Sequence, residues 1–480
     1  MGHANLNDAR DAVSCVVQTG MVPETASLGL YKLEWRQRRH LLRCANWNGA
    51  RDGVSGIVQT CTTLFPPEKM IVQVCIMAKI TIFRPEFKNI LTMKRLLGVL
   101  SVACLALQAP VWAQQNINQE KQVITSPVVK GDKTVTFTLR APNANEVLIS
   151  GDWMQGQRFA PMQRGTDGVW TYTTEVLPSD VYIYSYLVDG TRIIDPSTVF
   201  QCRDVNSLFS MFYIDGEYGD YYQVQNVPHG NVSRVWYHSD RLKADRRMTI
   251  YTPAGYEESK ASYPVLYLLH GSGGDEEAWI TLGSVARIMD NLIAEGKVQP
   301  MIVVMPNGNP SKQAAPGETS DNLAYTPAMS NTFVGYKDGS YEQSFSEIIN
   351  YVETHYRVKA DKAHRAIAGL SMGGFHTLQI SANYPMFDYV GLFSPGISGL
   401  ADYKVELYEN LDEKLTKLKQ AGIKLYWIGI GKDDFLYKDV EVYRKKLDSL
   451  AFPYVYKETD KGHVWTNWRK YLMEFLQLIK

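Results

Sequence analysis

Ser371 lies in a sequence context that favours a catalytic nucleophile. It is the central residue of a G-L-S-M-G motif at 369–373, which follows a short apolar run at 365–368 and precedes a segment of helical character at 375–380. A strand, a sharp turn and a helix form the context of a G-x-S-x-G nucleophile elbow, in which the tight turn leaves room only for small residues beside the serine. The motif therefore predicts an exposed serine hydroxyl at the end of a buried strand.

A histidine and a carboxylate follow two later predicted strands. His463 comes after the short strand expected at 454–457, and Asp433 and Asp434 come after the strand expected at 425–430. A serine hydroxyl is a weak nucleophile near neutral pH, so we expect His463 to accept its proton and a carboxylate to orient the imidazole. We select Asp434 as that carboxylate because it is the fourth residue of a G-x-x-D turn, and Asp433 is the alternative.

A glycine-rich loop, H-G-S-G-G at 270–274, follows the predicted strand at 265–269. Glycines allow backbone N–H groups to approach a substrate closely, so we expect the N–H groups of Ser272 and Met372 to bind the oxyanion of a tetrahedral intermediate. A phosphate-binding loop is disfavoured, because the sequence has no G-x-x-x-x-G-K-[ST] motif and no G-x-G-x-x-G motif that opens a helix. No metal site is expected, because no H-E-x-x-H motif or Cys/His cluster is present.

Near-continuous apolar runs alternate with amphipathic segments of helical period after Arg246. Such runs mark strands that are covered on both faces, and their alternation with helices predicts an α/β fold with a mostly parallel sheet and helices on both faces. The main expected strands are 248–251, 265–269, 301–305, 366–368, 389–393 and 425–430, and the expected helices include 344–356, 411–420, 440–450 and 465–479. The candidate catalytic residues follow the carboxyl ends of such strands, where ligands bind in open α/β sheets.

Residues 119–222 are predicted to form a small all-β domain. Strands are expected at 133–139, 146–150, 169–173 and 182–188, with turn residues between them. Short strands with regular turn signals favour a sandwich. Its Trp153 and Trp170 are expected to pack in the core or between domains, with sugar stacking as the alternative. We expect residues 218–245 to link this domain to a second domain, placed at 226–480.

The overall composition is that of a globular protein without excess charge. The 480 residues are 45% hydrophobic, and 50 basic residues balance 50 acidic ones, which argues against a nucleic-acid partner or an anionic membrane surface. The 10 Trp and 29 Tyr residues suit sugar or phenolic ligands as well as ordinary packing. Five of the six cysteines precede residue 113, so no disulfide is expected after that point.

A secretory signal peptide is predicted at 93–113, inside the chain. Met93 begins a basic segment, the apolar run at 96–107 follows, and Ala113 ends a suitable cleavage site. We expect Met93 to be the true start, the mature product to be periplasmic or secreted, and no membrane span to remain in it. Residues 1–92 are expected to be upstream sequence from a wrong start assignment, without ordered structure, and a small extra domain is the alternative.

Four motifs in the second domain carry a family resemblance: Y-L-L-H-G at 267–271, A-G-L-S-M-G-G at 368–374, G-K-D-D at 431–434 and G-H-V-W at 462–465. On these motifs the region 226–480 resembles carbohydrate esterase family 1, the feruloyl and acetyl-xylan esterases, and the related enterochelin-esterase-like enzymes. The β domain is similar to the early-set, immunoglobulin-like domains related to glycogen-binding modules.

The resemblance implies an α/β-hydrolase fold and removal of feruloyl or acetyl groups from plant xylan through an acyl-serine at Ser371. The expected partners are polysaccharide or oligosaccharide esters of the plant cell wall, and no cofactor is implied. A siderophore or other small-ester hydrolase is an alternative, and so is a carbohydrate-binding protein without catalysis. Substrate contacts are expected from Trp279, Tyr325 and Trp465 and from the long polar loop at 307–341.

Overall fold

The computed structural model describes residues 124–480, apart from 155, 320–337 and 398–404. The chain divides into two units, Met1–Asn118 and Gln119–Lys480, and every described residue lies in the second. The predictions for residues 1–92 and for a signal peptide at 93–113 therefore fall outside the described residues.

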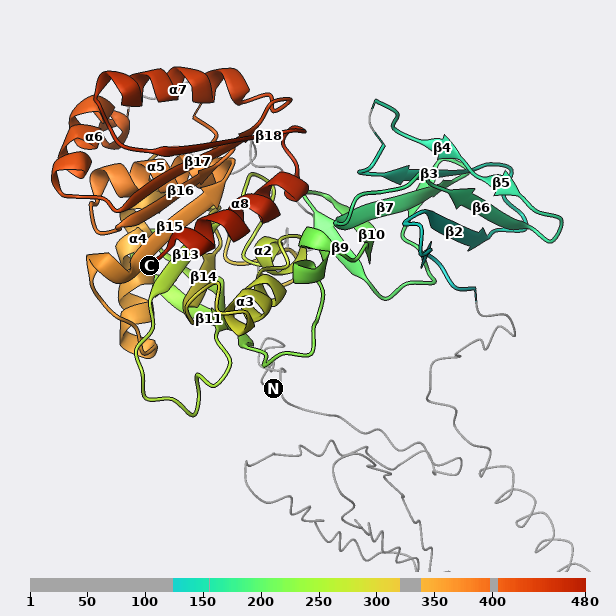
Figure 1. The fold of residues 1–480 in the computed structure, drawn as a ribbon, viewed down its shortest axis with the longest axis horizontal. Coiled ribbons are helices and arrows are strands. Elements are labelled where there is room, and N and C mark those ends of the chain that lie inside the picture. The colour runs from blue at the N-terminus through green and yellow to red at the C-terminus, as the bar shows by residue number, and fades with distance from the viewer. Residues whose placement is uncertain (1–123, 155, 320–337, 398–404) are drawn as a thin grey trace, which may run out of the picture. The chain divides into compact units, whose positions relative to one another are not determined.

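The first part of the described chain is all-β and consists of two sheets (Figure 1). One sheet has the order β1-β2-β6-β5 and the other the order β4-β3-β7-β10-β9, with β8 paired to β7. The bounds are β1 Val128–Val129, β2 Val135–Arg140, β3 Val147–Gly151, β4 Ala160–Pro161, β5 Gln163–Arg164, β6 Val169–Thr173, β7 Val181–Val188, β8 Thr191–Ile193, β9 Gln201–Asp204 and β10 Ser207–Tyr213. Alternating side chains from both sheets fill one shared core, as expected for a sandwich.

Aromatic side chains dominate the core of this sandwich. The ring of Phe137 in β2 packs against Trp153 at a centroid distance of 5.3 Å and against Tyr184 of the opposite sheet at 4.7 Å. Trp170 is also buried, and its Nε1–H donates to the carbonyl of Ala141. Trp153 and Trp170 are therefore core residues, which confirms the first of the two roles considered for them.

The second part contains a large sheet of eight strands in the order β11-β12-β14-β13-β15-β16-β17-β18. The strand β12 is antiparallel to both of its neighbours, β11 and β14, and all pairs from β14 onward are parallel. The bounds are β11 Asn231–Ser239, β12 Ala244–Thr252, β13 Val265–Leu269, β14 Ile302–Pro306, β15 Arg365–Leu370, β16 Tyr389–Phe393, β17 Leu425–Gly431 and β18 Val455–Thr459. The prediction of a mostly parallel sheet is confirmed.

Helices cover both faces of this sheet (Figure 1). The bounds are α2 Ala278–Thr281, α3 Val285–Ala294, α4 Ser340–His355, α5 Met372–Asn383, α6 Leu411–Gln420, α7 Tyr437–Ser449 and α8 Trp465–Leu478, with short 3-10 helices η2 Glu217–Tyr222, η4 Lys362–His364 and η6 Glu406–Tyr408. Side chains of β13 alternate between the faces, because Tyr267 and Leu269 pack with α4–α7 whereas Leu266 and Leu268 pack with α2, α3 and α8.

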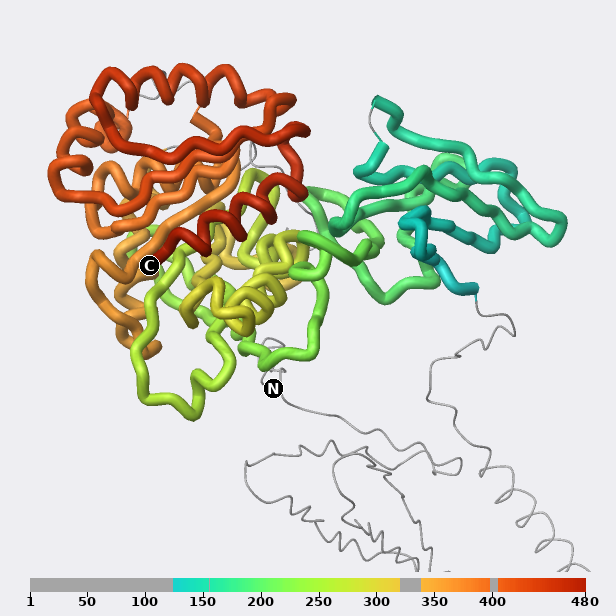
Figure 2. Tube along the Cα trace, in the orientation of Figure 1, coloured from blue at the N-terminus to red at the C-terminus, as the bar shows by residue number. Residues whose placement is uncertain are grey.

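The segment 218–245 is more than the linker that the sequence predicted. It contains all but the first residue of η2 and the whole of β11, which pairs with β12 along nine residues at the edge of the large sheet. Many side chains of β11 face solvent, so the strand has no continuous apolar run to mark it. At the other end of the chain, α8 crosses the face of β16 and β17 (Figure 2).

A buried ion pair joins the all-β part to the helix α8. The guanidinium of Arg469 donates to Asp180 Oδ1 at 2.8 Å and to the carbonyls of Val181 and Leu282, and both charged side chains are 3% exposed. Burial alone would raise the pKa of Asp180, but Arg469 and neighbouring hydrogen bonds bring that pKa below its ordinary value. The carboxylate therefore stays charged because its partner is present.

Replacing Arg469 by Met is expected to lower the free energy of unfolding by about 3–5 kcal/mol, because Asp180 would then be a buried charge without an opposite charge beside it. Chemical denaturation at pH 7 measures the change. The control is Lys417→Met, which removes an exposed pair with Glu413 and is expected to have little effect. Equal losses in the two variants would contradict this account of the pair.

Candidate active site

Ser371 occupies a strained turn between β15 and α5. Its φ of 52° and ψ of −114° lie outside the regions that residues other than glycine usually adopt. The turn is held by hydrogen bonds from Ser371 N–H to the carbonyl of Phe393 at 2.9 Å and from Gly396 N–H to the carbonyl of Ser371 at 2.7 Å. A Cβ atom on Gly369 would lie 2.4 Å from the backbone of Gly373, so the spacing of the two glycines follows from contact between strand and helix.

His463 and Asp434 are hydrogen-bonded, although 29 residues separate them in the chain. The Nδ1–H of His463 donates to Asp434 Oδ2 at 2.9 Å and lies 3.1 Å from Oδ1. Asp434 is buried and also accepts a hydrogen bond from the N–H of Leu436, whereas Asp433 is exposed. The structure therefore places Asp434, the residue selected from the sequence, beside the imidazole of His463. Because Nδ1 of His463 donates this bond, Nε2 of the same ring is the nitrogen that can accept a proton.

The loops that carry Asp434 and His463 touch through their backbones. A Cβ atom on Gly431 would lie 2.2 Å from the carbonyl oxygen of Lys461, so only glycine allows this approach. The N–H of Asp433 donates to the same carbonyl at 3.0 Å. The side-chain amide of Asn467 donates to the carbonyl of Gly462 at 3.0 Å, which ties the histidine loop to α8. The G-x-x-D and G-H motifs thus meet at one place.

The glycine-rich loop lies directly beside the serine. A Cβ atom on Gly271 would lie 3.3 Å from Ser371 Cβ and 2.5 Å from Leu370 Cδ1. Ser272 and Ser371 line the same cavity. Met372 is the first residue of α5, where backbone N–H groups lack partners within the helix and favour negative charge. The two N–H groups expected to bind an oxyanion therefore lie on elements that meet at Ser371.

His270 fixes the start of this loop and is buried. Its Nδ1–H donates to the carbonyl of Gly271 at 2.8 Å, and its Nε2 accepts from the N–H of Gly308 at 2.7 Å. The bond that Nε2 accepts requires a neutral imidazole, and burial lowers the pKa of His270 to about 4.

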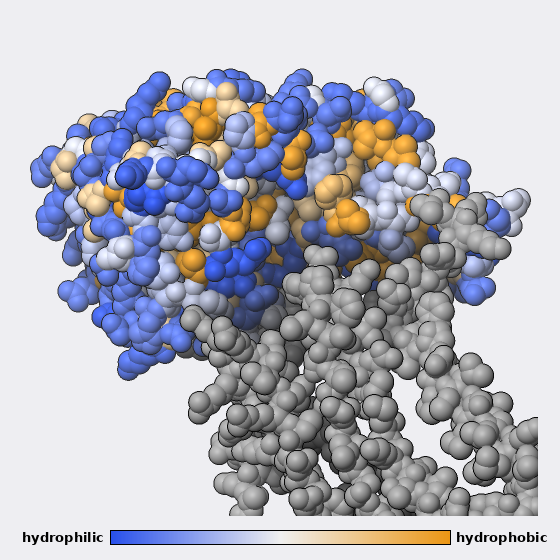
Figure 3. Space-filling view, turned by 90° about the horizontal axis from the view of Figure 1, so that it is seen from below, coloured by the Kyte–Doolittle hydropathy of each residue, from blue (hydrophilic) through white to orange (hydrophobic). Residues whose placement is uncertain are grey.

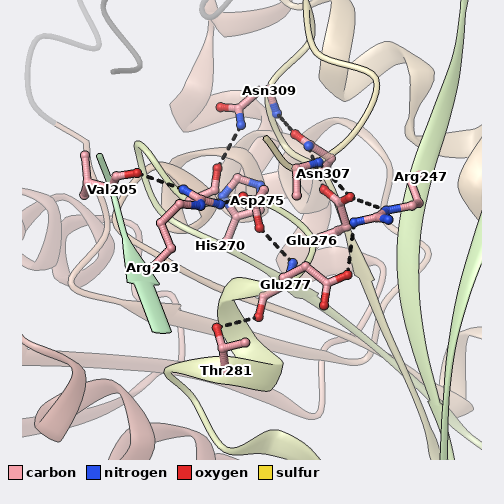
Figure 4. Close-up of polar contacts among 12 residues, drawn as sticks. Arg203, Val205, Arg247, His270, Asp275, Glu276, Glu277, Thr281, Asn307 and Asn309 are labelled. Atoms are coloured by element: carbon pink, nitrogen blue, oxygen red, sulfur yellow. Dashed lines mark hydrogen bonds and ion pairs between the residues drawn. The ribbon is translucent and has the colours of Figure 1, made fainter. Parts of the chain in front are cut away.

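Glu276 anchors the far end of the loop (Figure 4). Its carboxylate accepts hydrogen bonds from Arg247 Nε at 2.6 Å, from Asn307 Nδ2 at 2.8 Å and from the N–H of Ala315 at 2.9 Å. Arg247 and Glu276 are both buried. The loop is thus held at both ends by polar contacts that the interior isolates from water.

A cavity of about 850 Å³ lies beside the glycine-rich loop, of which Gly271, Ser272 and Gly274 line it. Ser371 and His463 line it together with Trp465, and its wall includes residues of β9 and of the turn that follows β9. Sequence reasoning missed that contribution from the all-β part. It also missed Phe435, whose ring lies 4.6 Å from the His463 ring and is 73% exposed. Its place immediately after Asp434 is the one signal that could have indicated a role.

The three aromatic residues expected to contact substrate have different outcomes. Trp465 lines the cavity, and its contact with substrate stays a prediction. The prediction for Trp279 is wrong, because its side chain is 0% exposed and its Nε1–H donates to the carbonyl of Leu269 within the core. Tyr325 lies outside the described residues, as does most of the polar loop at 307–341, although Pro316 and Glu318 of that loop line the cavity.

A family model described as "Putative esterase" matches residues 239–479. This chain belongs to that esterase family. The match covers the large sheet from the end of β11 onward, with Ser371, Asp434 and His463 inside it. The mostly parallel sheet of this part, with helices on both faces, agrees with the α/β-hydrolase fold predicted for it.

Similar proteins include an endo-1,4-beta-xylanase/feruloyl esterase of Xylanibacter ruminicola, 31% identical over 328 residues, which are 62% of this chain and 42% of that protein. An acetyl esterase of Caldicellulosiruptor saccharolyticus is 23% identical over 50% of this chain and 95% of its own length. The esterase-family chain thus spans less than half of the Xylanibacter protein. The enterobactin esterase of Shigella flexneri shares its fold, with a TM-score of 0.52, 17% identity and coverage of 72% of this chain and 92% of that one.

Asp434→Asn is expected to lower kcat for ester hydrolysis by about 10⁴-fold, because an amide donor opposite His463 Nδ1 favours the wrong tautomer. Steady-state kinetics on a soluble aryl ester measure the loss. The matched control is Asp433→Asn, the adjacent exposed carboxylate, which is expected to retain near wild-type turnover. A large loss in the Asp433 variant alone would reverse the assignment.

His270 is expected to make stability depend on pH. Because its pKa is depressed from 6.5 to about 4, its contribution is complete above pH 6.5 and is lost as the pH falls toward 4. The loss from this group is about 3 kcal/mol. Urea unfolding of wild type and His270→Gln at pH 7, 5.5 and 4 should show a smaller decrease in the variant, and parallel decreases would contradict the prediction.

Proposed function

We propose that this chain is a serine carboxylic-ester hydrolase that removes feruloyl or acetyl groups from plant xylan through an acyl-serine intermediate. The observation that carries the proposal is the hydrogen bond of His463 Nδ1 with the buried carboxylate of Asp434, because His463 lines the same cavity as Ser371. The feruloyl-esterase relative and the acetyl-esterase relative support the substrate class.

The proposed reaction has two halves. The hydroxyl of Ser371 attacks the ester carbonyl while its proton passes to His463 Nε2, and the N–H groups of Ser272 and Met372 bind the oxyanion. The tetrahedral intermediate expels the sugar alkoxide, which takes the proton from His463 and leaves the acyl group on Ser371. Water then attacks the acyl-serine with His463 again as base, which releases the carboxylic acid and restores the hydroxyl.

The cavity supports a substrate larger than an acetyl group alone. Its volume of about 850 Å³ lies near the upper end of the range for ligand pockets, so an aromatic acid and part of a sugar chain fit together. Phe435 and Trp465 offer aromatic surface on its wall. An exposed large aromatic side chain beside a catalytic imidazole is well placed to contact a phenolic ring or a sugar face.

Two further predictions from the sequence, export of the chain and the class of its all-β domain, are part of the proposal. We infer that residues 93–113 direct the chain to the periplasm or the exterior and that the all-β sandwich is an early-set, immunoglobulin-like domain. No helix among the described residues is long and apolar enough to span a membrane. On the face in Figure 3, polar residues cover most of the described surface in view and apolar residues form separate patches.

Ser371→Ala is expected to lower kcat by about 10⁶-fold on methyl ferulate, because no other group can form the acyl intermediate. Product release is followed by chromatography with wild type, the variant, and three substrates: methyl ferulate, acetylated xylan and a trilactone siderophore. Wild type is expected to act on the first two.

Two outcomes would contradict the proposal in different ways. Turnover of the siderophore alone would favour the small-ester alternative. Absence of any turnover by folded wild type, together with binding to xylan, would favour a carbohydrate-binding protein without catalysis.

A further inference from the structure

A valine occupies the tip of the hairpin between β9 and β10. Val205 and Asn206 form the two-residue connection, and Val205 has a φ of 53°. Two-residue hairpin connections favour Asn-Gly or Gly-containing pairs at such positions, because a branched side chain is strained in the left-handed region. A strained residue of this kind persists only where surrounding contacts hold it, and such residues cluster at functional sites.

The side chain of Val205 lies against the glycine-rich loop. A Cβ atom on Gly273 would lie 2.8 Å from Val205 Cγ1 and 3.2 Å from Cγ2, so the valine methyl groups cover the backbone of Gly273. Gly273 is the residue after Ser272, whose N–H is expected to bind the oxyanion. The hairpin tip therefore contacts the loop immediately beside a proposed catalytic donor.

Arg203 holds the tip in this position (Figure 4). Its Nη1 donates to the carbonyl of Val205 at 2.8 Å, and its guanidinium forms an ion pair with Asp275, two residues beyond Gly273. The side chain of Asp275 is 4% exposed, so water screens this pair weakly. The hairpin thus contacts this segment at two points, through an apolar contact with Gly273 and an ion pair with Asp275.

The same hairpin also reaches the element that follows His463. Asp204 lines the cavity together with Trp465, the first residue of α8. Arg203, Asp204 and Val205 all line the cavity together with Ser371 and His463. Three consecutive residues of the all-β part therefore form one wall of the site.

We propose that Val205 is a positioning residue that fixes the Ser272 N–H for oxyanion binding, so that the all-β part is a working component of the active site. The inference rests on the proposed ester hydrolysis. An oxyanion donor must lie about 2.7–3.1 Å from the developing charge, and small displacements of such groups reduce the rate strongly. A glycine at position 205 would relieve the backbone strain but would remove the methyl groups that contact Gly273. We infer that the strained valine is kept for this contact.

Val205→Gly separates this role from a structural one. Glycine relaxes the left-handed backbone, so the variant is expected to be at least as stable as wild type. Active sites are counted by titration with an organophosphate, and kcat on methyl ferulate per active site is expected to fall between tenfold and a hundredfold. The KM is expected to change less than threefold. The inhibition constant of an aryl boronic acid, which forms a tetrahedral adduct on Ser371, should weaken by a similar factor.

Two further variants complete the test. Val205→Ile keeps the branched contact and is expected to retain wild-type kcat, and Val205→Ala, which keeps the strained backbone, is expected to lose activity even if Val205→Gly unfolds. Lys243→Gly is the matched control, because Lys243 has a φ of 52° in an exposed turn outside the cavity lining, and it should not change kcat.

Wild-type kcat in folded Val205→Gly and Val205→Ala, with an unchanged boronic-acid constant, would overturn the inference and leave the esterase proposal intact. Absence of ester turnover in wild type would overturn both. A loss of stability in Val205→Gly with full activity per titrated site would show a structural role only, and would also overturn the inference.

Discussion

The hydrogen bond between His463 Nδ1 and the buried carboxylate of Asp434 is the interaction on which the proposed chemistry depends. It can form only because the loops after β17 and β18 touch at Gly431 and Lys461, and these loops meet because the two strands are parallel neighbours. The serine elbow follows β15 in the same sheet, two strands away from β17. Parallel pairing therefore places three polar groups at one edge, and glycines allow the close backbone contacts that this edge requires.

The all-β part has its own core but also contributes residues to the wall of the candidate active site. Arg469 binds Asp180 in the interior, and Arg203 binds Asp275 beside the glycine-rich loop. Both contacts involve segments next to proposed catalytic groups, since Arg469 lies on the helix after His463 and Asp275 follows Ser272 by three residues. Substitutions in either of these two contacts are thus expected to change the rate of ester hydrolysis.

Local sequence signals predicted most of the large sheet and the three candidate catalytic residues, because each depends on short-range physics. Continuous apolar runs marked β13 and β16 at their observed bounds, since strands covered on both faces need apolar side chains throughout. The edge strand β11 was missed because its exposed side chains leave no such run. The cavity residues Arg203 and Val205 were missed because the residues they contact, Asp275 and Gly273, lie about 70 positions further along the chain. Trp279 was assigned wrongly because aromatic character does not distinguish a cavity wall from a core.

The central claim is that Ser371 is the nucleophile and that His463 activates it. Labelling with a fluorophosphonate, followed by peptide mass spectrometry, tests this most directly, because the probe bonds to an activated serine oxygen. A single adduct on Ser371 in wild type, absent from His463→Ala, is the predicted result. An adduct on a different residue, or equal labelling of Ser371 without the imidazole, would contradict the account.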